Sequence, residues 1–596
     1  IDLSSSGKQP MNSNCGRFVL TFNGEIYNHL DLRVELEKQG HSTNWRGYSD
    51  TETLIEAIAH WGLDDALCRT RGMFALAIWD KKQRNLSLAR DRIGEKPLYW
   101  GWAESDLIFG SELKSLRAHP NCQNGICIDA LSQYLRYMYV PSPLSIYEGI
   151  FKLEPGTILT VEDIPLLSPP RKPIRPGERY GGISIRRYWN LKTQVETAAK
   201  NKIKEDNDAI ISLEKTLKEA VESQMISDVP LGAFLSGGVD SSTLVALMQS
   251  LKNENVKTFT IGFNEYNYDE SNHAEAVANH LGTEHNKLLV TDADARDVIP
   301  DLPQLYDEPF ADSSQIPTYL ICRSARKKVT VAISGDGGDE LFGGYNRYVY
   351  GPKIWRNISN IPTPLKKLMS FSTQKIPQEV WDRFGDIYNK FRPGSKGISN
   401  FGYKVHRLGK KLINSDSFDE LYINMISNYI EPNKLIKKDI YEPTSQLQDR
   451  LSELGIQDPT MKMMFQDMRT YLPDDILCKV DRASMGTSLE TRSPFLDPDV
   501  ISLSMRLPMH MKIRDSEGKW ALRQVLYKYV PKDIIDRPKE GFAIPVGLWL
   551  RGPLREWVED LLSNNNLAKD GMFNSDVILK AWKEHLSGKK DWTNLL

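Results

Sequence analysis

Residues 229–242 read VPLGAFLSGGVDSS, an apolar run that ends in serines, glycines and one aspartate. Residues 229–235 predict a buried strand, and residues 241–252 predict the helix that follows it. Adjacent glycines let backbone N–H groups approach an anion closely, and the N-terminus of a helix favours negative charge. The segment therefore predicts a phosphate-binding loop. It is not a Walker P-loop, because no Gly-Lys-Ser or Gly-Lys-Thr is present.

Asp240 is unusual within such a loop, because a carboxylate repels a phosphate group. A cation between the two would remove the repulsion, and Mg²⁺ commonly bridges a carboxylate and substrate phosphates. The loop therefore predicts a Mg²⁺-dependent phosphate site. The alternative is a plain glycine-rich turn after a strand, which would need neither the serine hydroxyls nor the aspartate.

Strands and helices alternate on both sides of this loop. Further strands are predicted at residues 256–263, 286–290 and 328–334, and helices at residues 208–226, 269–281 and 315–327. Alternation of this kind predicts a doubly wound parallel sheet with right-handed crossovers, which binds ligands at the carboxyl ends of its strands. Beyond residue 350 the pattern becomes mostly helical.

The first 115 residues have a different pattern, rich in short apolar runs. Residues 17–22 predict a strand that stops at a turn formed by Asn23-Gly24, and residues 73–79 (MFALAIW) predict a strand buried on both faces. Other strands are predicted at residues 85–89, 98–102 and 107–109, and a helix at residues 30–36. We expect a strand-rich, layered domain here.

A connecting region follows, in which residues 165–187 are rich in proline and arginine and include RKPIRP at 171–176. We expect an exposed hairpin or loop there, and a contact with nucleic acid is the weaker alternative.

Composition narrows the class of protein. The chain has 596 residues, too many for one core, and 76 basic residues against 78 acidic ones. This balance argues against a nucleic-acid binder that acts through bulk charge. No run of about 18 apolar residues is present, so no membrane-spanning helix is expected. The six cysteines lack zinc-site spacing, and free thiols are favoured over a Cys122–Cys127 disulfide, so we expect a cytoplasmic protein.

Ser236–Ser242 resembles the pyrophosphate loop of the N-type ATP pyrophosphatases, which adenylate carboxyl or carbonyl oxygens. Residues 22–28 (FNGEIYN), 49–52 (SDTE) and 89–99 (ARDRIGEKPLY) resemble the class II glutamine amidotransferase domain. That domain ahead of such a loop is the arrangement of the glutamine-hydrolysing asparagine synthetase family. Further matching motifs lie at residues 147–150, 269–271, 307–310, 334–345, 479–482, 490–497 and 537–542.

The resemblance implies an α/β multi-domain protein. Its expected parts are an αββα amidotransferase layer domain of the N-terminal-nucleophile type over residues 1–160, a linker and hairpin over 161–205, and an ATP-dependent synthetase domain over 206–596. The last is expected to combine a doubly wound sheet of the adenine-nucleotide-hydrolase kind with a largely helical C-terminal part. Family members are often dimers, so a homodimer stays open.

For the glutamine site, the resemblance implies an oxyanion hole formed by the Asn23 side chain and the Gly24 backbone N–H. Glu25 and Asp50 would hold the α-amino group of glutamine. The family's nucleophile is an N-terminal cysteine well upstream of the NGE motif, and we expect it, like the last C-terminal segment, to be missing from this sequence. Cys15 is internal and is not expected to replace it, so no glutaminase activity is expected from the chain as written.

For the nucleotide site, the resemblance implies a set of contacts with ATP and Mg²⁺, the expected cofactors. Adenosine would lie against the backbone of Leu235 and Ile261 and against Ser334-Gly335. The departing pyrophosphate would be bound by Ser236, Gly237, Gly238, Ser241 and Ser242. Asp240 and Asp339 would hold Mg²⁺, and Lys479 and Lys519 would lie near the phosphates and the adenylate.

The implied reaction is the amidation of aspartate to asparagine through β-aspartyl-AMP, with ammonia that travels from glutamine through an internal tunnel. Asp336 departs from the family pattern, which commonly has glutamate there. Aspartate is shorter by about 1.5 Å. Amidation of another carboxylate, such as a uronic-acid sugar of a surface polysaccharide, therefore stays open. A β-lactam-forming enzyme and a non-catalytic interaction or storage protein are the remaining alternatives.

Overall fold

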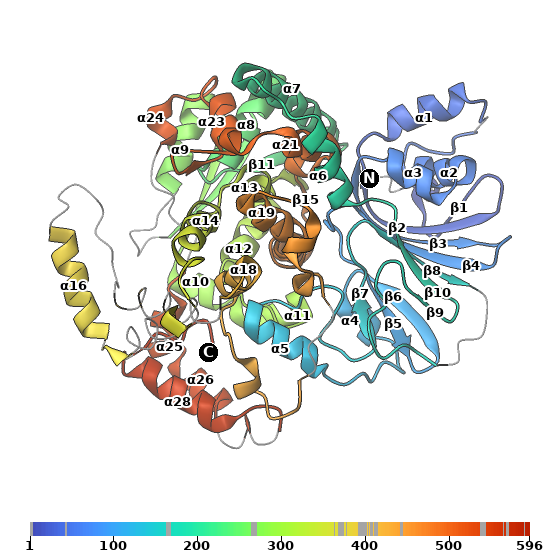
Figure 1. The fold of residues 1–596 in the computed structure, drawn as a ribbon. Coiled ribbons are helices and arrows are strands. Elements are labelled where there is room, and N and C mark those ends of the chain that lie inside the picture. The colour runs from blue at the N-terminus through green and yellow to red at the C-terminus, as the bar shows by residue number, and fades with distance from the viewer. Residues whose placement is uncertain are drawn as a thin grey trace.

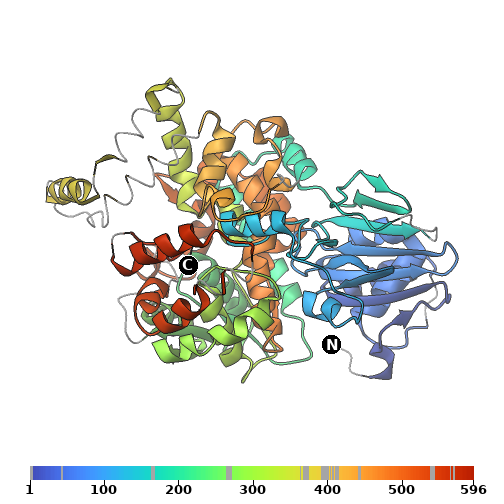
Figure 2. The ribbon, with the colours of Figure 1, turned by 90° about the horizontal axis from the view of Figure 1, so that it is seen from below.

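The structure is a computed structural model. It describes residues 4–595, apart from residues 42–43, 163–167, 264–270, 363, 367–374, 377, 391–401, 403–404, 406–408, 410–414, 441–444, 537–543, 564–565, 568–570 and 589. The motif at 537–542 and most of the one at 269–271 lie outside the described residues, as do residues 1–3. Two parts lie side by side, a smaller one rich in strands and a larger one rich in helices (Figures 1 and 2).

The strand-rich part contains two antiparallel sheets. The larger sheet has the order β1 (Met11–Asn12), β2 (Phe18–Ile26), β3 (Gly72–Asp80), β4 (Asn85–Arg90), β8 (Thr157–Glu162), β10 (Ile183–Arg187) and β9 (Arg179–Tyr180). The smaller sheet has the order β6 (Asp106–Gly110), β5 (Tyr99–Ala103) and β7 (Ile150–Lys152). The helices of this part are α1 (His29–Lys38), α2 (Asp50–Trp61), α3 (Leu63–Arg69), α4 (Leu113–Arg117) and α5 (Ile128–Tyr137).

Strand β3 shows how the layers stack. Phe74, Leu76 and Ile78 pack in one core with helices α1, α2 and α3. Ala75 and Ala77 point to the other face and pack with the smaller sheet, because successive residues of a strand alternate between its faces. Helices α4 and α5 pack on the smaller sheet in turn. The apolar run at 73–79 is thus buried on both faces, as predicted, and the layers follow the order αββα.

The predicted turn at Asn23-Gly24 is wrong. Strand β2 continues through both residues to Ile26 and pairs with β3 along its whole length. Gly24 is extended, and a Cβ atom there would lie 2.1 Å from the carbonyl oxygen of Met73. This glycine is therefore required for close packing against the neighbouring strand rather than for a turn.

The connecting region forms the predicted hairpin, but it is not simply exposed. Strands β9 and β10 extend the larger sheet through β8. Arg175 and Arg187 point inward, and both form ion pairs with the buried Glu154. Hydrophobic periodicity could not show this burial, because Glu154, the partner of the two arginines, lies in the loop between β7 and β8.

The larger part is centred on a five-stranded sheet, which is parallel throughout. Its order is β13 (Glu284–Val290), β12 (Lys257–Phe263), β11 (Leu231–Phe234), β14 (Val331–Ile333) and β15 (Glu490–Arg492). The chain runs outward in one direction from β11 to β13 and then returns to β14 on the other side. The strand order therefore reverses between β11 and β14, where a doubly wound sheet opens a ligand crevice.

Helices cover both faces of this sheet. Ala233 and Ile333 pack in a core with α7 (Asp206–Gln224), α8 (Val239–Leu251) and α9 (Ser271–Leu281). Phe234 and Ala332 pack on the opposite face with α12 (Gln315–Ala325) and α20 (Leu477–Met485). The predicted strands and helices of residues 208–334 are confirmed, with ends that differ by a few residues.

The other elements are mostly helical, as predicted beyond residue 350. The helices are α6 (Leu191–Lys200), α10 (Asp292–Arg296), α11 (Leu302–Tyr306), α13 (Gly338–Phe342), α14 (Asn346–Ile358), α16 (Gln378–Lys390), α18 (Phe418–Ile426), α19 (Pro459–Arg469), α21 (Pro498–Arg506), α22 (Met509–Lys512), α23 (Trp520–Leu526), α24 (Lys532–Ile535), α25 (Val546–Arg551), α26 (Arg555–Leu561) and α28 (Ser575–Leu586). A short hairpin of β16 (Ile513–Arg514) and β17 (Glu517–Gly518) precedes α23.

Among the described residues, no helix is both long enough and apolar enough to cross a membrane. All six cysteines are free thiols, as predicted. The two parts are joined by ion pairs, including one between the buried side chains of Lys96 and Asp481 at 3.0 Å and one between the partly exposed Arg71 and the buried Asp497 at 2.8 Å.

Candidate active site

The predicted phosphate loop follows β11 and opens directly into α8. The backbone N–H of Ser236 donates to the Ser241 hydroxyl at 3.1 Å, and the two hydroxyls lie 3.0 Å apart. Gly237 has a φ of 71°, and a Cβ atom there would lie 2.8 Å from the backbone nitrogen of Ala274. The loop thus bends tightly against α9, and it presents hydroxyls and glycine backbone at the start of a 13-residue helix.

Residues 334–339 come from the neighbouring strand β14 and meet this loop. A Cβ atom on Gly338 would lie 2.6 Å from Oδ1 of Asp240, and one on Gly335 would lie 3.1 Å from its Cβ. Both glycines are therefore needed for the close approach of the two loops. Ser334, Gly335 and Asp339 therefore belong to a loop that lies against Asp240, at the reversal of strand order where a ligand crevice is expected.

Lys519 closes the crevice from the start of α23. Its ammonium forms an ion pair with Asp339 at 2.6 Å and a second ion pair with Asp240. Burial alone would lower the pKa of Lys519, but the two carboxylates raise it above its usual value. The structure thus brings together two carboxylates and one cation from three separate segments.

Leu235 and Ile261 contribute backbone rather than side chains. The Leu235 N–H donates to the carbonyl oxygen of Phe259 at 2.9 Å, and both the Leu235 and the Ile261 side chains are buried in apolar cores. A ligand in the crevice can therefore meet these two residues only through their main chain.

Asp336 lies behind the loop and is held by serines. The Ser334 hydroxyl donates to its Oδ2 at 2.5 Å, and the Ser493 hydroxyl donates to its backbone oxygen at 2.6 Å. Burial raises the pKa of the Asp336 carboxyl. A carboxyl with a raised pKa in a crevice is suited to accept and release a proton.

Lys479 pairs with a residue that sequence reasoning missed. Its ammonium donates to Asp312 at 2.7 Å and to the Ser314 hydroxyl at 2.8 Å. Burial would raise the pKa of Asp312, but the Lys479 ammonium lowers it below its usual range. Asp475 lies beside this pair, and burial together with the charge of Asp312 raises its pKa well above the usual range. No local pattern marks Asp312, although it follows the matched motif at 307–310.

The glutamine-site residues lie in the strand-rich part, on β2 and at the start of α2. Burial and the nearby Asp50 raise the pKa of Glu25 to about 8, while Arg492 opposes the shift. Asp50 accepts the backbone N–H of Ile26 at 2.8 Å. Arg492 was not predicted, and it lies 3.7 Å from Glu25 although it belongs to β15 of the larger part. The pocket therefore places two carboxyl groups close together, and in their ionised form they suit an ammonium group.

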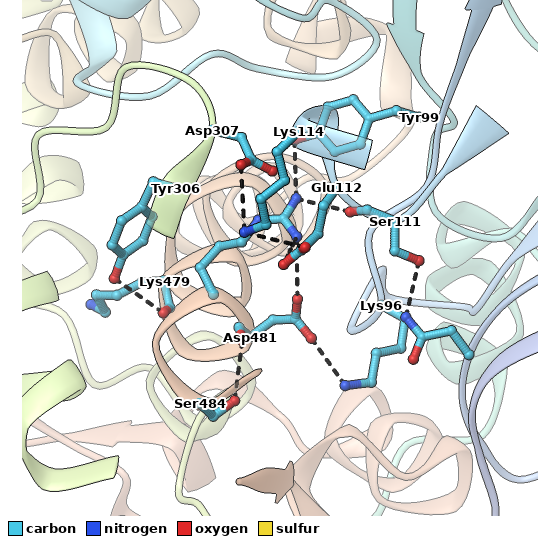
Figure 3. A network of polar contacts seen from close by, with 12 residues as sticks. Lys96, Tyr99, Ser111, Glu112, Lys114, Tyr306, Asp307, Lys479, Asp481 and Ser484 are labelled. Carbon is cyan, nitrogen blue, oxygen red and sulfur yellow. Dashed lines mark hydrogen bonds and ion pairs between the residues drawn. The ribbon is translucent and has the colours of Figure 1, made fainter. Parts of the chain in front are cut away.

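Asn23 connects this pocket to the larger part. Its side-chain N–H donates to the Ser111 hydroxyl at 2.9 Å, and Arg482 donates to the Ser111 carbonyl oxygen at 3.0 Å. Arg482 lies on α20, one turn beyond Lys479. Figure 3 shows the polar side chains around this helix. Asp481 points toward Lys96, and the carbonyl oxygen of Lys479 accepts a hydrogen bond from the Tyr306 hydroxyl. The helix thus contacts both candidate sites.

Two small cavities lie between the sites. One of about 20 Å³ is lined by Asp336 and Arg492, and one of about 10 Å³ lies beside Tyr99 and Cys478. Glu95 lines both, and burial together with the charge of Asp91 raises its pKa well above the usual range. Two separate cavities, each with room for about one water-sized molecule, therefore lie along the boundary of the two parts.

Comparison with known proteins gives matches to both parts. Residues 212–596 match the family described as asparagine synthase, and residues 1–166 match the one described as glutamine amidotransferase domain. Glutamine-hydrolysing asparagine synthetase 1 of Bacillus subtilis is 33% identical and covers 100% of this chain and 87% of the relative. A putative asparagine synthetase of Mycobacterium tuberculosis is 33% identical over 97% of this chain and 83% of the relative. An amidase of Penicillium rubens is 24% identical over 96% and 83%. Together with the observed layers, these matches confirm the predicted fold class.

Proposed function

The chain belongs to the asparagine synthase family and carries a glutamine amidotransferase domain, and on that premise we propose that it converts aspartate to asparagine with ATP. Glutamine-dependent amidation is the chemistry of this family. Aspartate as the acceptor, the AMP-linked intermediate and the role of each residue are parts of the proposal. Its substrates are metabolites of the cytoplasm, where we propose that the enzyme acts.

In the first step, an oxygen of the aspartate β-carboxylate attacks the α-phosphorus of ATP. The bond to the β-phosphate breaks, pyrophosphate leaves, and a mixed anhydride with AMP remains. Ser236, Ser241 and Ser242 donate hydrogen bonds to the departing pyrophosphate, and the N-terminus of α8 favours its charge. Lys519 supplies an ammonium that exchanges its carboxylate partners for the phosphate oxygens, which stabilises the charge on the leaving group.

Mg²⁺ fits the donor set of this crevice. Asp240 and Asp339 meet at one ammonium, so both carboxylates reach one point. Among the described residues, no cluster of three or more histidine, cysteine or acidic side chains could hold a metal on its own, and Mg²⁺ typically takes one or two carboxylates plus substrate phosphates. When bound, Mg²⁺ would neutralise part of the charge on the phosphates.

In the second step, ammonia attacks the carbonyl carbon of the anhydride and AMP leaves with its oxygen. The attacking nitrogen must lose a proton, and we assign its acceptance to Asp336. Lys479, held by Asp312, is placed to balance the charge of the adenylate. The two cavities that share Glu95 support a path for ammonia from the Glu25 side to Asp336, since both are lined by residues of both parts.

The observation that carries this proposal is the meeting of Asp240, Asp339 and Lys519 beside the serine loop at the reversal of strand order. The test is pyrophosphate release from ATP with ammonium chloride and aspartate. Release that depends on aspartate and yields asparagine supports the proposal. Absence of release with every acid supplied would contradict adenylation altogether.

Asp336 favours a second candidate for the carboxylate that is amidated. Asp336 occupies a position where the family commonly has glutamate, and its carboxylate is anchored to Ser334. The shorter side chain leaves space for a bulkier acceptor than aspartate. The same assay with glucuronic or galacturonic acid in place of aspartate decides between the two, because pyrophosphate release then follows the true acceptor.

A further inference from the structure

A cleft of about 360 Å³ lies where the two parts and the connecting segment meet, away from both candidate sites. This volume lies within the range of small-molecule pockets, roughly 300–1,000 Å³. None of its lining residues belongs to the serine loop, to the glutamine pocket or to the two cavities between them. Its walls come from the strand-rich part, from the start of α6, and from α19 with the segment before it.

Positive charge dominates this cleft. Its lining includes the basic residues Arg92, Arg175, Arg187, Lys192, Arg450 and Arg469. Asp449 and Glu453 also line it, and Glu154 lies buried behind Arg175 and Arg187. Six cations against the two lining carboxylates leave a net charge of +4, and counting Glu154 and Glu196, which pair with lining cations, leaves +2, in a chain whose overall net charge is -2.

These cations are held close together despite their repulsion. Arg469 is bound to Asp449 and donates to the Gln446 side chain at 2.8 Å. Burial and the nearby Arg187 both lower the pKa of Arg469, which Asp449 opposes. Arg92 is 7% exposed, and its Nη1 has no hydrogen-bond partner within the described part of the chain. Such a cluster is stabilised when an anion enters it.

Two further features select the kind of anion. Helix α6 begins in the cleft, capped by Asn190, and a ten-residue helix adds positive potential at its N-terminus. The indole of Trp189 lines the same space. Guanidinium groups bind phosphate oxygens in a bidentate manner, and an indole offers a face on which a flat ring can stack.

We propose that this cleft is a second ligand site, which binds a small organic phosphate with a flat ring, such as a nucleoside monophosphate. The arginines and the start of α6 bind the phosphate, and Trp189 contacts the ring. This inference goes beyond the proposed function and does not rest on it. Because both parts contribute to the walls, the ligand would hold the connecting segment against α19 and stabilise the junction of the two parts.

The experiment measures how many AMP molecules bind to each full-length chain, by equilibrium dialysis. The cleft variant is Lys192→Glu with Arg450→Glu, whose side chains are 42% and 77% exposed, so the fold does not depend on them. The control variant is Lys215→Glu with Arg555→Glu, two exposed residues outside the cleft that, like Lys192 and Arg450, each pair with a nearby glutamate. Both variants change the net charge equally.

The control should bind one more AMP per chain than the cleft variant does at about 1 mM ligand. This difference of one is expected whether or not AMP also binds at the serine loop, so failure of the proposed function would lower both counts equally. Equal counts and equal affinities in the two variants would overturn the cleft site. Neutralisation by Lys192→Gln with Arg450→Gln should weaken AMP binding at the cleft by about tenfold. This milder variant replaces the charge-reversed one if charge reversal disturbs folding.

Two competitors test the chemistry of the ligand. Labelled AMP at the cleft should be displaced less well by adenosine or by inorganic phosphate than by unlabelled AMP. Adenosine lacks the phosphate, and inorganic phosphate lacks the ring. Trp189→Leu should weaken AMP and leave the competition by inorganic phosphate unchanged. If adenosine competed as well as AMP, or inorganic phosphate bound as tightly as AMP, the assignment to a ring-bearing phosphate would be wrong.

Discussion

The proposed nucleotide crevice and the proposed glutamine pocket are both rich in half-buried carboxyl groups, but these groups are paired differently in the two sites. In the crevice, Asp240 and Asp339 share Lys519, and Asp312 is paired with Lys479. In the pocket, Glu25 faces Asp50, and its pKa is raised to about 8. In the proposed function, the lysine pairs prepare the crevice for phosphates, whereas the neighbouring carboxyl groups of the pocket, which share no lysine among the described residues, hold an ammonium group when they are ionised.

The largest effect is expected from the lysine of the crevice. Lys519→Met removes the ammonium that meets both carboxylates, so pyrophosphate release should fall by about 10²–10³-fold or more. Lys519→Arg should retain part of the rate, because it keeps the charge. The melting temperature of each variant shows whether the fold persists. Turnover by Lys519→Met within a few-fold of the unaltered chain would show that the paired lysine is not part of the phosphate site.

Asp336 tests whether the crevice also performs proton transfer. Asp336→Asn keeps the size of the side chain and removes its basicity, so ammonia-dependent amide formation should fall by about 10²-fold. Single-turnover experiments that separate pyrophosphate release from amide formation locate the loss. If only pyrophosphate release slowed, Asp336 would act in adenylation and the assigned proton acceptance would be incorrect.

Substitution of Glu25 tests the proposed glutamine pocket. Glu25→Gln should weaken glutamine binding by about tenfold, as expected for the loss of one charge-assisted hydrogen bond. Since a pKa of about 8 leaves much of Glu25 protonated at neutral pH, glutamine affinity should rise between pH 6 and pH 8 as the carboxylate forms. Calorimetric titration at several pH values measures both effects. An affinity independent of pH in the unaltered chain would argue that Glu25 does not contact the ammonium.

Lys512 is a buried lysine without the carboxylate pairs of Lys519. It donates to the carbonyl oxygen of Leu341 at 2.7 Å, and burial lowers its pKa to about 7. The unfolded chain therefore binds more protons at this residue between about pH 7 and pH 10, so its contribution makes the fold more stable as pH rises through that window. The expected slope is about 1 kcal/mol between pH 7 and pH 8.

Lys512→Met should remove that slope from the pH dependence of the free energy of unfolding, measured with urea. Lys353→Met is a suitable control, since Lys353 is an exposed lysine bonded to Ser516. An unchanged slope in the Lys512 variant would mean that this lysine stays charged in the fold, and the contrast with Lys519 would fail.

Local patterns could predict the fold well but the site only in part. The strand, loop and helix at residues 229–252 are encoded by neighbouring residues, and the run at 73–79 shows its double burial directly. The turn expected at Asn23-Gly24 was wrong because the packing of Gly24 depends on Met73, which lies in another strand. Asp312 and Arg492 were missed for the same reason, since their partners lie far away in sequence.

The resemblance to a family supplied what local patterns could not, namely that residues near 25, 240 and 519 belong to one enzyme. It did not reveal the arginine-lined cleft, because the six cations come from four separate stretches of the chain. Only the fold brings Arg175 of the proline-rich segment close to Arg469 of α19.

The most direct test is a crystal structure of the chain with Mg²⁺ and a non-hydrolysable ATP analogue. We predict that the β- and γ-phosphates lie beside Ser236–Ser242, with the metal between them and Asp240 and Asp339, and with Lys519 turned from the carboxylates to the phosphates. Triphosphate density elsewhere, with the Lys519 ion pairs intact, would contradict this prediction.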